Sequence, residues 1–344
     1  MRCVSLFSGC GGLDRGLQEA GFDIVFSADS WATCAESYKA NFDSASFSLT
    51  SIEDLDEAHL QRVIKGGVEL VAGGPPCPPF SKSRFYRTDK PRALQDPAGL
   101  TSLDSYMKVV ELVKPRAFLL ENVFGLAYKI HRPALEYLLE RAASLGFECS
   151  WSVLNAADYG VPQIRERFFL VGVQSGVFRF PEPTHTKAPD AQLLDGLRPW
   201  VTAGNAIEDL DTEANASDEG HFAGGRYHDL LVEVPPGDNY LYFTEKRGHP
   251  QPKFEWRSRY WSFLLKLSPE LPSWTIQARR SNNMGPFHWR NRILRISEIK
   301  RLQTFPDEWE LAGKVEDQWR QVGNAVPPLL ARRIGDAVRT ALQT

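Results

Sequence analysis

The chain has 344 residues, 42% of them hydrophobic and 24% charged, with a net charge of −3. These proportions are typical of globular proteins and exclude a disordered chain, a collagen-like repeat and a coiled-coil rod. The length is about twice the usual size of one domain, which predicts a large domain and a smaller one.

The first 175 residues alternate short apolar runs with helix-like patterns, which predicts a doubly wound α/β domain with a mostly parallel sheet. The predicted strands cover 3–7, 23–27, 68–72, 116–120, 149–154 and 167–173. The predicted helices cover 13–20, 32–41, 53–64, 104–113, 133–145, 297–303 and 327–342. From about residue 174 to residue 289 the sequence is irregular and rich in proline and glycine, which is typical of an inserted smaller domain.

Features that the sequence lacks predict its location. No apolar run approaches the ~20 residues of a membrane span, and the N-terminal segment runs into glycines instead of a signal-peptide cleavage site. We therefore expect a cytoplasmic protein without membrane contact. The five cysteines are scattered, without a CxxC pair or a His-rich cluster, so we expect neither a disulfide framework nor a metal site.

The small net charge hides two segments of opposite sign. Residues 181–244 hold twelve acids against three Lys or Arg, whereas residues 245–301 hold thirteen Lys or Arg against four acids. The basic segment also carries aromatic side chains, among them Trp256, Trp261 and Trp274. This mixture suits phosphates and bases, and it equally suits a solvated face over ordinary core aromatics.

In such a sheet ligands gather at the carboxyl ends of the strands, so the residues after each apolar run are the candidates for chemistry. After the first strand, Gly9, Gly11 and Gly12 permit a tight turn before a helix N-terminus. Their spacing is not a full GxGxxG motif, so it indicates a nucleotide-like ligand only weakly. Asp29 follows the second strand, where it suits a ribose hydroxyl and equally a helix cap.

Cys77 follows the apolar run VELVAGG and lies between two proline pairs in the motif PPCPP. The prolines make the loop rigid, which suits a nucleophile held at a defined angle, although most cysteines are simply buried. Residues 78–95 carry five Lys or Arg against one acid, and such surroundings lower the pKa of a thiol and attract phosphate. We interpret Cys77 as a candidate nucleophile.

Glu121 ends the apolar run AFLLENV. A carboxylate beside a buried strand is poorly solvated, so we expect its pKa to rise towards neutrality, which lets the group hold or donate a proton. The alternative is a structural glutamate that accepts hydrogen bonds from local backbone amides.

The segments FSGCGGLDRGL, GGPPCPPFS, ENV, QIRERFF and VGNAVPP, in this order, resemble five motifs of the cytosine-5 DNA methyltransferase family. The resemblance implies a Rossmann-like, S-adenosylmethionine-dependent fold. Its implied parts are a catalytic and cofactor-binding domain at 1–175, a target-recognition domain at 176–290, a hinge at 291–312 and a C-terminal segment at 313–344 that completes the catalytic domain. It also implies methylation at C5 of a flipped-out cytosine in double-stranded DNA, as in bacterial restriction–modification systems.

The family mechanism transfers to the matching residues of this chain. Cys77 would add to C6 of the cytosine, and protonated Glu121 would hydrogen-bond N3 and the exocyclic amine. Arg165 and Arg167 would position the base through O2 and orient the thiolate loop. The residues that the resemblance assigns to S-adenosylmethionine are Phe7, Gly9, Cys10, Gly12, Asp29, Pro76, Asn324 and Val326. No metal is expected.

Base flipping costs a few kcal/mol that contacts to DNA must offset. The residues expected to contact DNA are Ser81, Lys82 and Arg84 after the cysteine, and Arg279 and Arg280 in the basic segment. Double-stranded DNA is the expected partner, and it would associate the protein with the nucleoid. A restriction endonuclease that acts on the same site is a second expected partner, and we expect a monomer.

Three positions depart from the family pattern. Pro78 stands where the family commonly has Gln, Ser30 stands where a Trp often stacks on adenine, and no Asp for the adenine amine occurs around Ser48. Cofactor affinity would therefore be weaker, or another acid would substitute. The acids available for this are Asp43, Glu53 and Asp54.

Two other functions compete with DNA methylation. A transfer-RNA methyltransferase of the same chemistry is disfavoured by the large insertion and by the absence of a Cys-Phe-Thr tripeptide. A catalytically silent DNA-binding homologue would be expected to lose the thiol or the carboxylate, yet Cys77 and Glu121 are both present. A dinucleotide oxidoreductase explains neither PPCPP nor QIRER.

Overall fold

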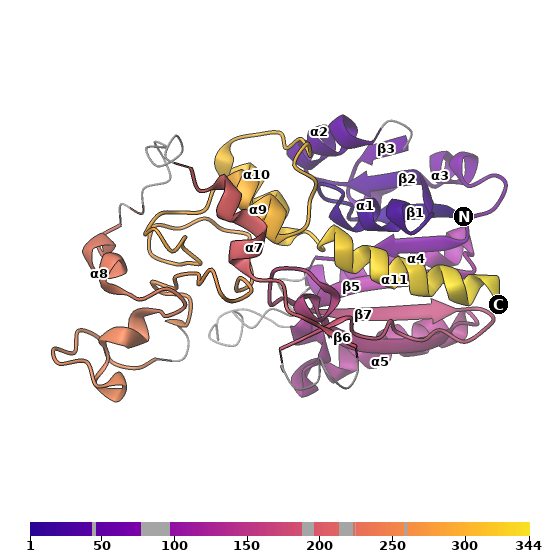
Figure 1. The fold of residues 1–344 in the computed structure, drawn as a ribbon. Coiled ribbons are helices and arrows are strands. Elements are labelled where there is room, and N and C mark those ends of the chain that lie inside the picture. The colour runs from indigo at the N-terminus through magenta and orange to yellow at the C-terminus, as the bar shows by residue number, and fades with distance from the viewer. Residues whose placement is uncertain (43–45, 77–96, 188–195, 213–222, 224, 258–259) are drawn as a thin grey trace.

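A seven-stranded sheet forms the centre of the larger of two lobes (Figure 1). The computed structural model describes residues 1–42, 46–76, 97–187, 196–212, 223, 225–257 and 260–344. The strand order is β3-β2-β1-β4-β5-β7-β6, in which neighbours from β3 to β5 are parallel and β7 is antiparallel to both β5 and β6. The strands are β1 Arg2–Leu6, β2 Asp23–Asp29, β3 Ser46–Leu49, β4 Leu70–Gly73, β5 Ala117–Val123, β6 Glu148–Asn155 and β7 Glu166–Val173.

Helices cover both faces of the sheet, as the doubly wound prediction requires. One apolar core joins α1 and α11 to one face, and another joins α3, α4 and α5 to the opposite face. The fold-class prediction is therefore confirmed. The helices of the larger lobe are α1 Gly12–Glu19, α2 Ala32–Asn41, α3 Glu57–Val63, α4 Pro97–Val113, α5 Arg132–Ser144 and α11 Pro328–Gln343.

The last helix returns the C-terminal segment to the first glycine loop. Pro328 occupies the first turn of α11, where a missing backbone N–H is tolerated. α11 then packs along α1, so the two ends of the chain lie side by side in the larger lobe (Figure 1). Gly16 on α1 allows this approach, because a Cβ there would collide with the Pro328 carbonyl oxygen.

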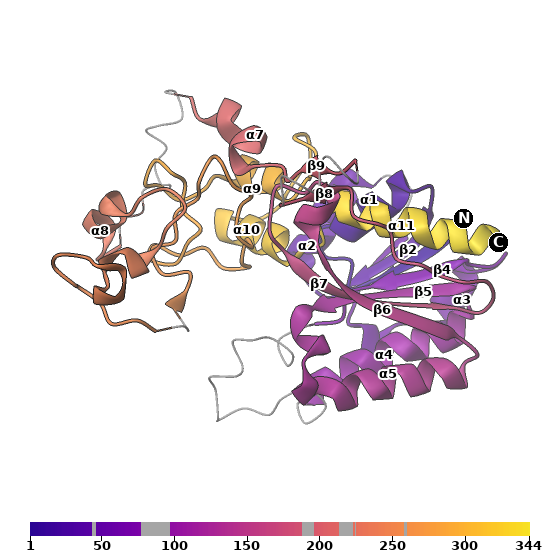
Figure 2. The same cartoon turned by 60° about the horizontal axis from the view of Figure 1, so that its bottom comes forward.

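The smaller lobe consists mainly of irregular chain with short helices (Figure 2). Its apolar core extends from Ala203 to Val322 and also takes in Cys10, Tyr38 and Phe42 of the larger lobe, so the core is continuous across the junction. Its helices are α7 Ala203–Ile207, α8 His228–Glu233, α9 Ile296–Leu302 and α10 Val315–Asn324, and the short strands β8 His185–Thr186 and β9 Arg198–Pro199 pair nearby.

The predicted strands all occur, with ends displaced by a few residues. The sequence missed β3, because this edge strand is only four residues long and none of its side chains is fully buried. The helix predicted at 53–64 divides into the 3-10 turn η1 Ile52–Asp54 and α3. Within the described ranges, no helix is long and apolar enough to cross a membrane.

Candidate active site

The candidate residues gather at one edge of the sheet because of the strand register. Leu6 of β1 is level with Ala28 of β2 and with Gly73 of β4, and Gly73 is level with Leu120 of β5. The glycine loop, Asp29, the start of the PPCPP segment and Glu121 therefore all lie at or next to carboxyl ends of strands at the same edge. β7 runs the other way and begins here, with Arg167 opposite Val123.

Asp29 holds the glycine loop to the start of α2. Its Oδ2 accepts a hydrogen bond from the Gly9 N–H at 2.9 Å, and its Oδ1 accepts one from the Trp31 N–H at 2.8 Å. Two positive φ angles, +56° at Gly9 and +88° at Gly11, shape the loop. Asp29 thus joins the glycine loop to the residue that precedes α2, and its remaining lone pairs can accept from a ligand.

The C-terminal segment closes against the glycine loop, as the resemblance implies. A Cβ on Gly12 would lie 2.5 Å from the Val326 carbonyl oxygen, so only glycine permits this contact. The Cys10 carbonyl accepts a 3.2 Å hydrogen bond from Trp309 Nε1. Burial raises the pKa of the Cys10 thiol to about 12, so this residue contributes its backbone and not a reactive sulfur.

The glycine loop leaves a cradle of the kind that a cofactor needs. A Cβ built at Gly9 would meet no atom within 4 Å, although neighbouring Gly11 and Gly12 are tightly packed. The half-exposed Phe7 and the exposed Asn324 and Pro76 belong to the segments around this edge. The residues present therefore fit the polar, open surface that S-adenosylmethionine requires at strand ends.

Trp31 is a candidate that the sequence analysis overlooked, because it stands one position beyond the expected tryptophan. It is the N-cap of α2, its ring is half-buried, and the Arg320 guanidinium lies 4.5 Å from the ring centroid. A search that allowed the tryptophan to stand one position later in the motif would have identified Trp31. The ring is an aromatic surface at the edge where the other cofactor candidates lie.

A cavity of about 580 Å³ lies between η1 and α4, and Ile52, Glu53 and Leu100 are among the residues that line it. The Thr50 N–H donates to the Asp29 carbonyl at 3.0 Å, so the chain that leads into η1 starts at the same edge of the sheet. The Asp54 carboxylate accepts a 2.8 Å hydrogen bond from Ser51 Oγ, whereas Glu53 lines the cavity together with Glu57 and Asp104. Asp43, the third substitute considered, lies outside the described residues.

Glu121 is buried near the end of β5, and its carboxylate lies between the backbone at Gly74 and the guanidinium of Arg167. A Cβ on Gly74 would lie 2.8 Å from Glu121 Oε2, and Arg167 Nε is 3.0 Å from Glu121 Oε1. The Asn122 side chain donates to the Pro75 carbonyl at 3.1 Å. The segment that leads into Cys77 is therefore hydrogen-bonded to the ENV motif through Asn122 and packs against Glu121 at Gly74, while Cys77 itself lies outside the described residues.

Burial raises the pKa of Glu121, and the positive charges of Arg167 and Arg165 oppose this shift without cancelling it. The direction agrees with the expectation from sequence. A carboxyl group with a raised pKa can remain protonated closer to neutral pH and donate a hydrogen bond.

Arg165 is wholly buried and donates to three backbone carbonyls in two distant segments. Its guanidinium donates to the carbonyls of Ile276 at 3.0 Å, Gly323 at 2.8 Å and Ala325 at 2.9 Å. It therefore joins the start of β7 to the smaller lobe and to the C-terminal motif. Sequence reasoning gave both arginines of QIRERFF the same role, but the structure gives Arg165 these additional structural contacts.

The residues expected to contact DNA have different environments. Arg279 is exposed, whereas the Arg280 side chain is only 15% exposed and lies 3.2 Å from Glu316 on α10. Arg280 would have to exchange this carboxylate for a phosphate or a base. Ser81, Lys82 and Arg84 lie outside the described residues.

Comparisons with known proteins agree with this geometry. The model of the C-5 cytosine-specific DNA methylase family matches residues 1–340. Type II methyltransferase M.SacI of Streptomyces achromogenes is 37% identical over 98% of this chain and 93% of its own length. Type II methyltransferase M1.HphI of Haemophilus parahaemolyticus is 33% identical over 97% of this chain and 86% of its own.

Solved structures show the same fold at low identity. A putative DNA modification methyltransferase encoded within an E. coli prophage has a TM-score of 0.68 at 20% identity, covering 100% of both chains. A mutant of Spodoptera frugiperda DNMT2 has a TM-score of 0.62 at 18% identity, covering 98% of this chain and 99% of that one.

The chain belongs to the C-5 cytosine-specific DNA methylase family, and the family expected from its five motifs is confirmed. Its curated relatives are type II methyltransferases, and the family uses S-adenosylmethionine as methyl donor.

Proposed function

We propose that the protein methylates C5 of a cytosine flipped out of double-stranded DNA, through a covalent bond between Cys77 and C6. The observation that supports this most directly is the position of Glu121. Its buried carboxyl group adjoins Gly74, three residues before Cys77, and pairs with Arg167. The proposed acid thus lies against the backbone that leads, three residues later, to the proposed nucleophile.

The residues at the sheet edge have distinct tasks in this proposal. The Cys77 thiolate attacks C6 while protonated Glu121 donates to N3, which draws electrons from the ring and leaves C5 nucleophilic. Arg167 stabilises the Glu121 side chain in its position and contacts the base through O2. After methylation a base removes the C5 proton, and elimination releases the Cys77 thiolate.

S-adenosylmethionine, when bound, supplies the electrophilic methyl group. We propose that the glycine loop, Asp29, Pro76, Asn324 and Val326 hold it, with Trp31 as the surface for adenine. Glu53 is the proposed acceptor for the adenine amine, because it lines the cavity beside η1. Val326 is 6% exposed and faces Gly12, so its contribution is to the shape of the cradle.

The remaining parts of the proposal concern assembly. We propose that residues 176–290 recognise the target sequence, that 291–312 act as the hinge and that 313–344 complete the catalytic domain at 1–175. A cognate restriction endonuclease and a monomeric state are proposed from the type II relatives and from the expectations above.

Methyl transfer from labelled S-adenosylmethionine, followed by bisulfite sequencing of the product DNA, tests the function. We expect label on DNA and protection of cytosines within one short sequence context. Label on transfer RNA and not on DNA would contradict the proposal.

A further inference from the structure

An exposed tryptophan lies at the far end of the smaller lobe, beside a cavity that the catalytic mechanism does not use. Trp256 is 52% exposed, and Lys246 Nζ lies 4.8 Å from the centroid of its ring. The cavity is about 430 Å³ and is lined by residues 244–246 and 252–256. We name these two segments, together with Arg257, the Trp256 surface.

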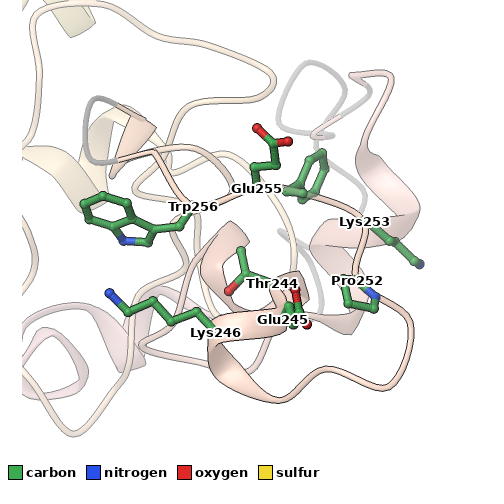
Figure 3. A pocket seen from close by; sticks show the side chains of 8 residues that line it. Thr244, Glu245, Lys246, Pro252, Lys253, Glu255 and Trp256 are labelled. Atoms are coloured by element: carbon green, nitrogen blue, oxygen red, sulfur yellow. The ribbon is translucent and has the colours of Figure 1, made fainter.

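The close view shows how the side chains are arranged around this cavity. Lys246 reaches toward the indole of Trp256, while the carboxylate of Glu255 and the ammonium group of Lys253 point away from the ring (Figure 3). The indole therefore presents an open face together with a nearby cation. This pairing is suited to a ligand that has both phosphate and flat or sugar surfaces.

Hydrogen bonds to neighbouring residues of the smaller lobe hold the Trp256 surface in one conformation. The buried Tyr240 hydroxyl accepts a hydrogen bond from the Arg257 N–H at 2.8 Å and donates one to the Arg257 carbonyl at 2.7 Å. The Lys253 N–H donates to the Phe243 carbonyl at 2.9 Å, and Thr244 Oγ1 donates to the Leu241 carbonyl at 2.7 Å. A preorganised surface loses little conformational entropy when a ligand binds.

The charges at the surface favour an anion. Residues 244–257 carry four Lys or Arg against two acids, Glu245 and Glu255. Glu255 lies 3.3 Å from Arg257, and Lys253 lies 3.4 Å from Glu233, so these charges partly neutralise one another in the free protein. Of the thirteen Lys or Arg in 245–301, Lys266, Arg292, Arg295 and Lys300 are buried, so the charges of the Trp256 surface itself are the ones that can attract a nucleic acid backbone.

Two further indole rings, those of Trp261 and Trp274, lie close to each other in this lobe. Trp261 is 44% exposed, and its ring lies 5.3 Å from that of Trp274. Next to Trp274 in the chain, the Ser273 N–H donates a hydrogen bond to the Pro162 carbonyl at 2.9 Å, and the Ser273 carbonyl accepts one from the Ile164 N–H at 2.8 Å. Pro162 and Ile164 come immediately before the two arginines of QIRERFF. Trp274 and the exposed Trp261 thus lie next to the segment that hydrogen-bonds the chain just before Arg165 and Arg167.

We propose that the Trp256 surface binds the flank of the DNA duplex, outside the methylated site. The indole packs against the sugar and base edge, and Lys246 contacts a phosphate. The inference rests on the proposed function, since it takes the DNA substrate as its ligand, but it concerns a different surface from the sheet edge.

The test compares two duplexes that share the methylation site mapped by bisulfite sequencing. One is about one and a half helical turns long and the other about four turns, so that only the second has flanks. Trp256→Ala should weaken binding of the long duplex about tenfold, as expected for a lost stacking contact, and leave the short duplex unaffected. Trp256→Phe should restore most of this affinity.

Two further variants sharpen the result. Lys246→Gln should lower the salt dependence of long-duplex binding by about one phosphate contact. Trp151→Ala is the matched control, because Trp151 is 45% exposed on β6 of the other lobe and should not affect either duplex. Thermal unfolding of each variant verifies that the fold is retained.

Equal affinity of wild type and Trp256→Ala for the long duplex would overturn the inference, as would an equal loss on both duplexes. A protein partner at this surface would produce the first result. These outcomes are independent of the proposed function, which fails if the wild-type protein transfers no methyl group to DNA.

Discussion

Glu121 Oε1 and Arg167 Nε lie 3.0 Å apart across the antiparallel pair formed by β5 and β7. Arg167 is opposite Val123, two positions beyond Glu121, so both side chains emerge on the same face of the sheet. The antiparallel direction of β7 is what allows this, since it brings the start of that strand to the edge where the others end. The pair joins an acid whose pKa is raised by burial to a cation that lies against it.

Replacing Glu121 by Gln should lower the turnover number by about 10²–10⁴, the usual effect of losing a general acid. Gln keeps the size of the side chain, so DNA binding and stability should change little. Single-turnover methyl transfer with saturating DNA measures the effect. Unchanged turnover would remove Glu121 from the mechanism.

The raised pKa of Glu121 gives this reaction a pH dependence. Because the protonated form is the active one, the turnover number should fall as the pH rises through the raised pKa of this carboxyl group. On the acid side, protonation of Cys77 should slow the reaction. Glu121→Gln should lose the alkaline decrease, since an amide does not titrate in this range; an identical decrease in this variant would assign it to another group.

The two arginines of QIRERFF should respond differently to substitution. Arg165→Ala leaves three carbonyls, two of them in buried hydrogen bonds, without this donor and should lower the free energy of unfolding by about 3 kcal/mol. Arg167→Ala should cost less stability than Arg165→Ala, because Arg167 pairs with a single carboxylate, and should lower the turnover number by about 10²-fold. Urea unfolding and methyl transfer, measured on both variants, separate these roles. Wild-type stability of Arg165→Ala would contradict the assignment.

Gly9→Ala tests the cofactor cradle against a matched control. Gly9 and Gly146 both have positive φ angles, +56° and +83°, and open space around an added Cβ, but Gly146 precedes β6 at the opposite edge of the sheet. Both substitutions should cost about 1–2 kcal/mol of stability. Only Gly9→Ala should raise the Kd for S-adenosylmethionine, measured by calorimetry; equal affinities in the two variants would exclude this part of the loop from the cofactor site.

Sequence patterns identified the buried strands well, because β4 and β5 are continuous apolar runs whose side chains pack on both faces. They did not identify α10, whose sequence VEDQWRQVGN is mostly polar and whose buried Trp319 and Val322 pack against the smaller lobe. Tertiary contacts, and not local propensity, determine that helix.

Some features of the candidate site could likewise be predicted from the sequence, and others could not. Glu121 and Asp29 were identified because each follows a strand, and strand ends meet at one edge of a parallel sheet. The structural contacts of Arg165 were not predictable, because its partners are more than a hundred residues away, at Ile276, Gly323 and Ala325. The hydrogen bond from the Gly9 N–H to Asp29 likewise depends on the three-dimensional turn of the loop.

Capture of a covalent complex tests the central claim most directly. Fluorine at C5 cannot be removed as a proton is, so a 5-fluorocytosine duplex with S-adenosylmethionine should hold the protein on DNA through denaturation. Cys149→Ala, which removes a half-buried thiol on β6 whose pKa burial raises to about 11, should retain this capture. Cys77→Ala should abolish it; a denaturation-resistant complex that persists in Cys77→Ala would contradict the account.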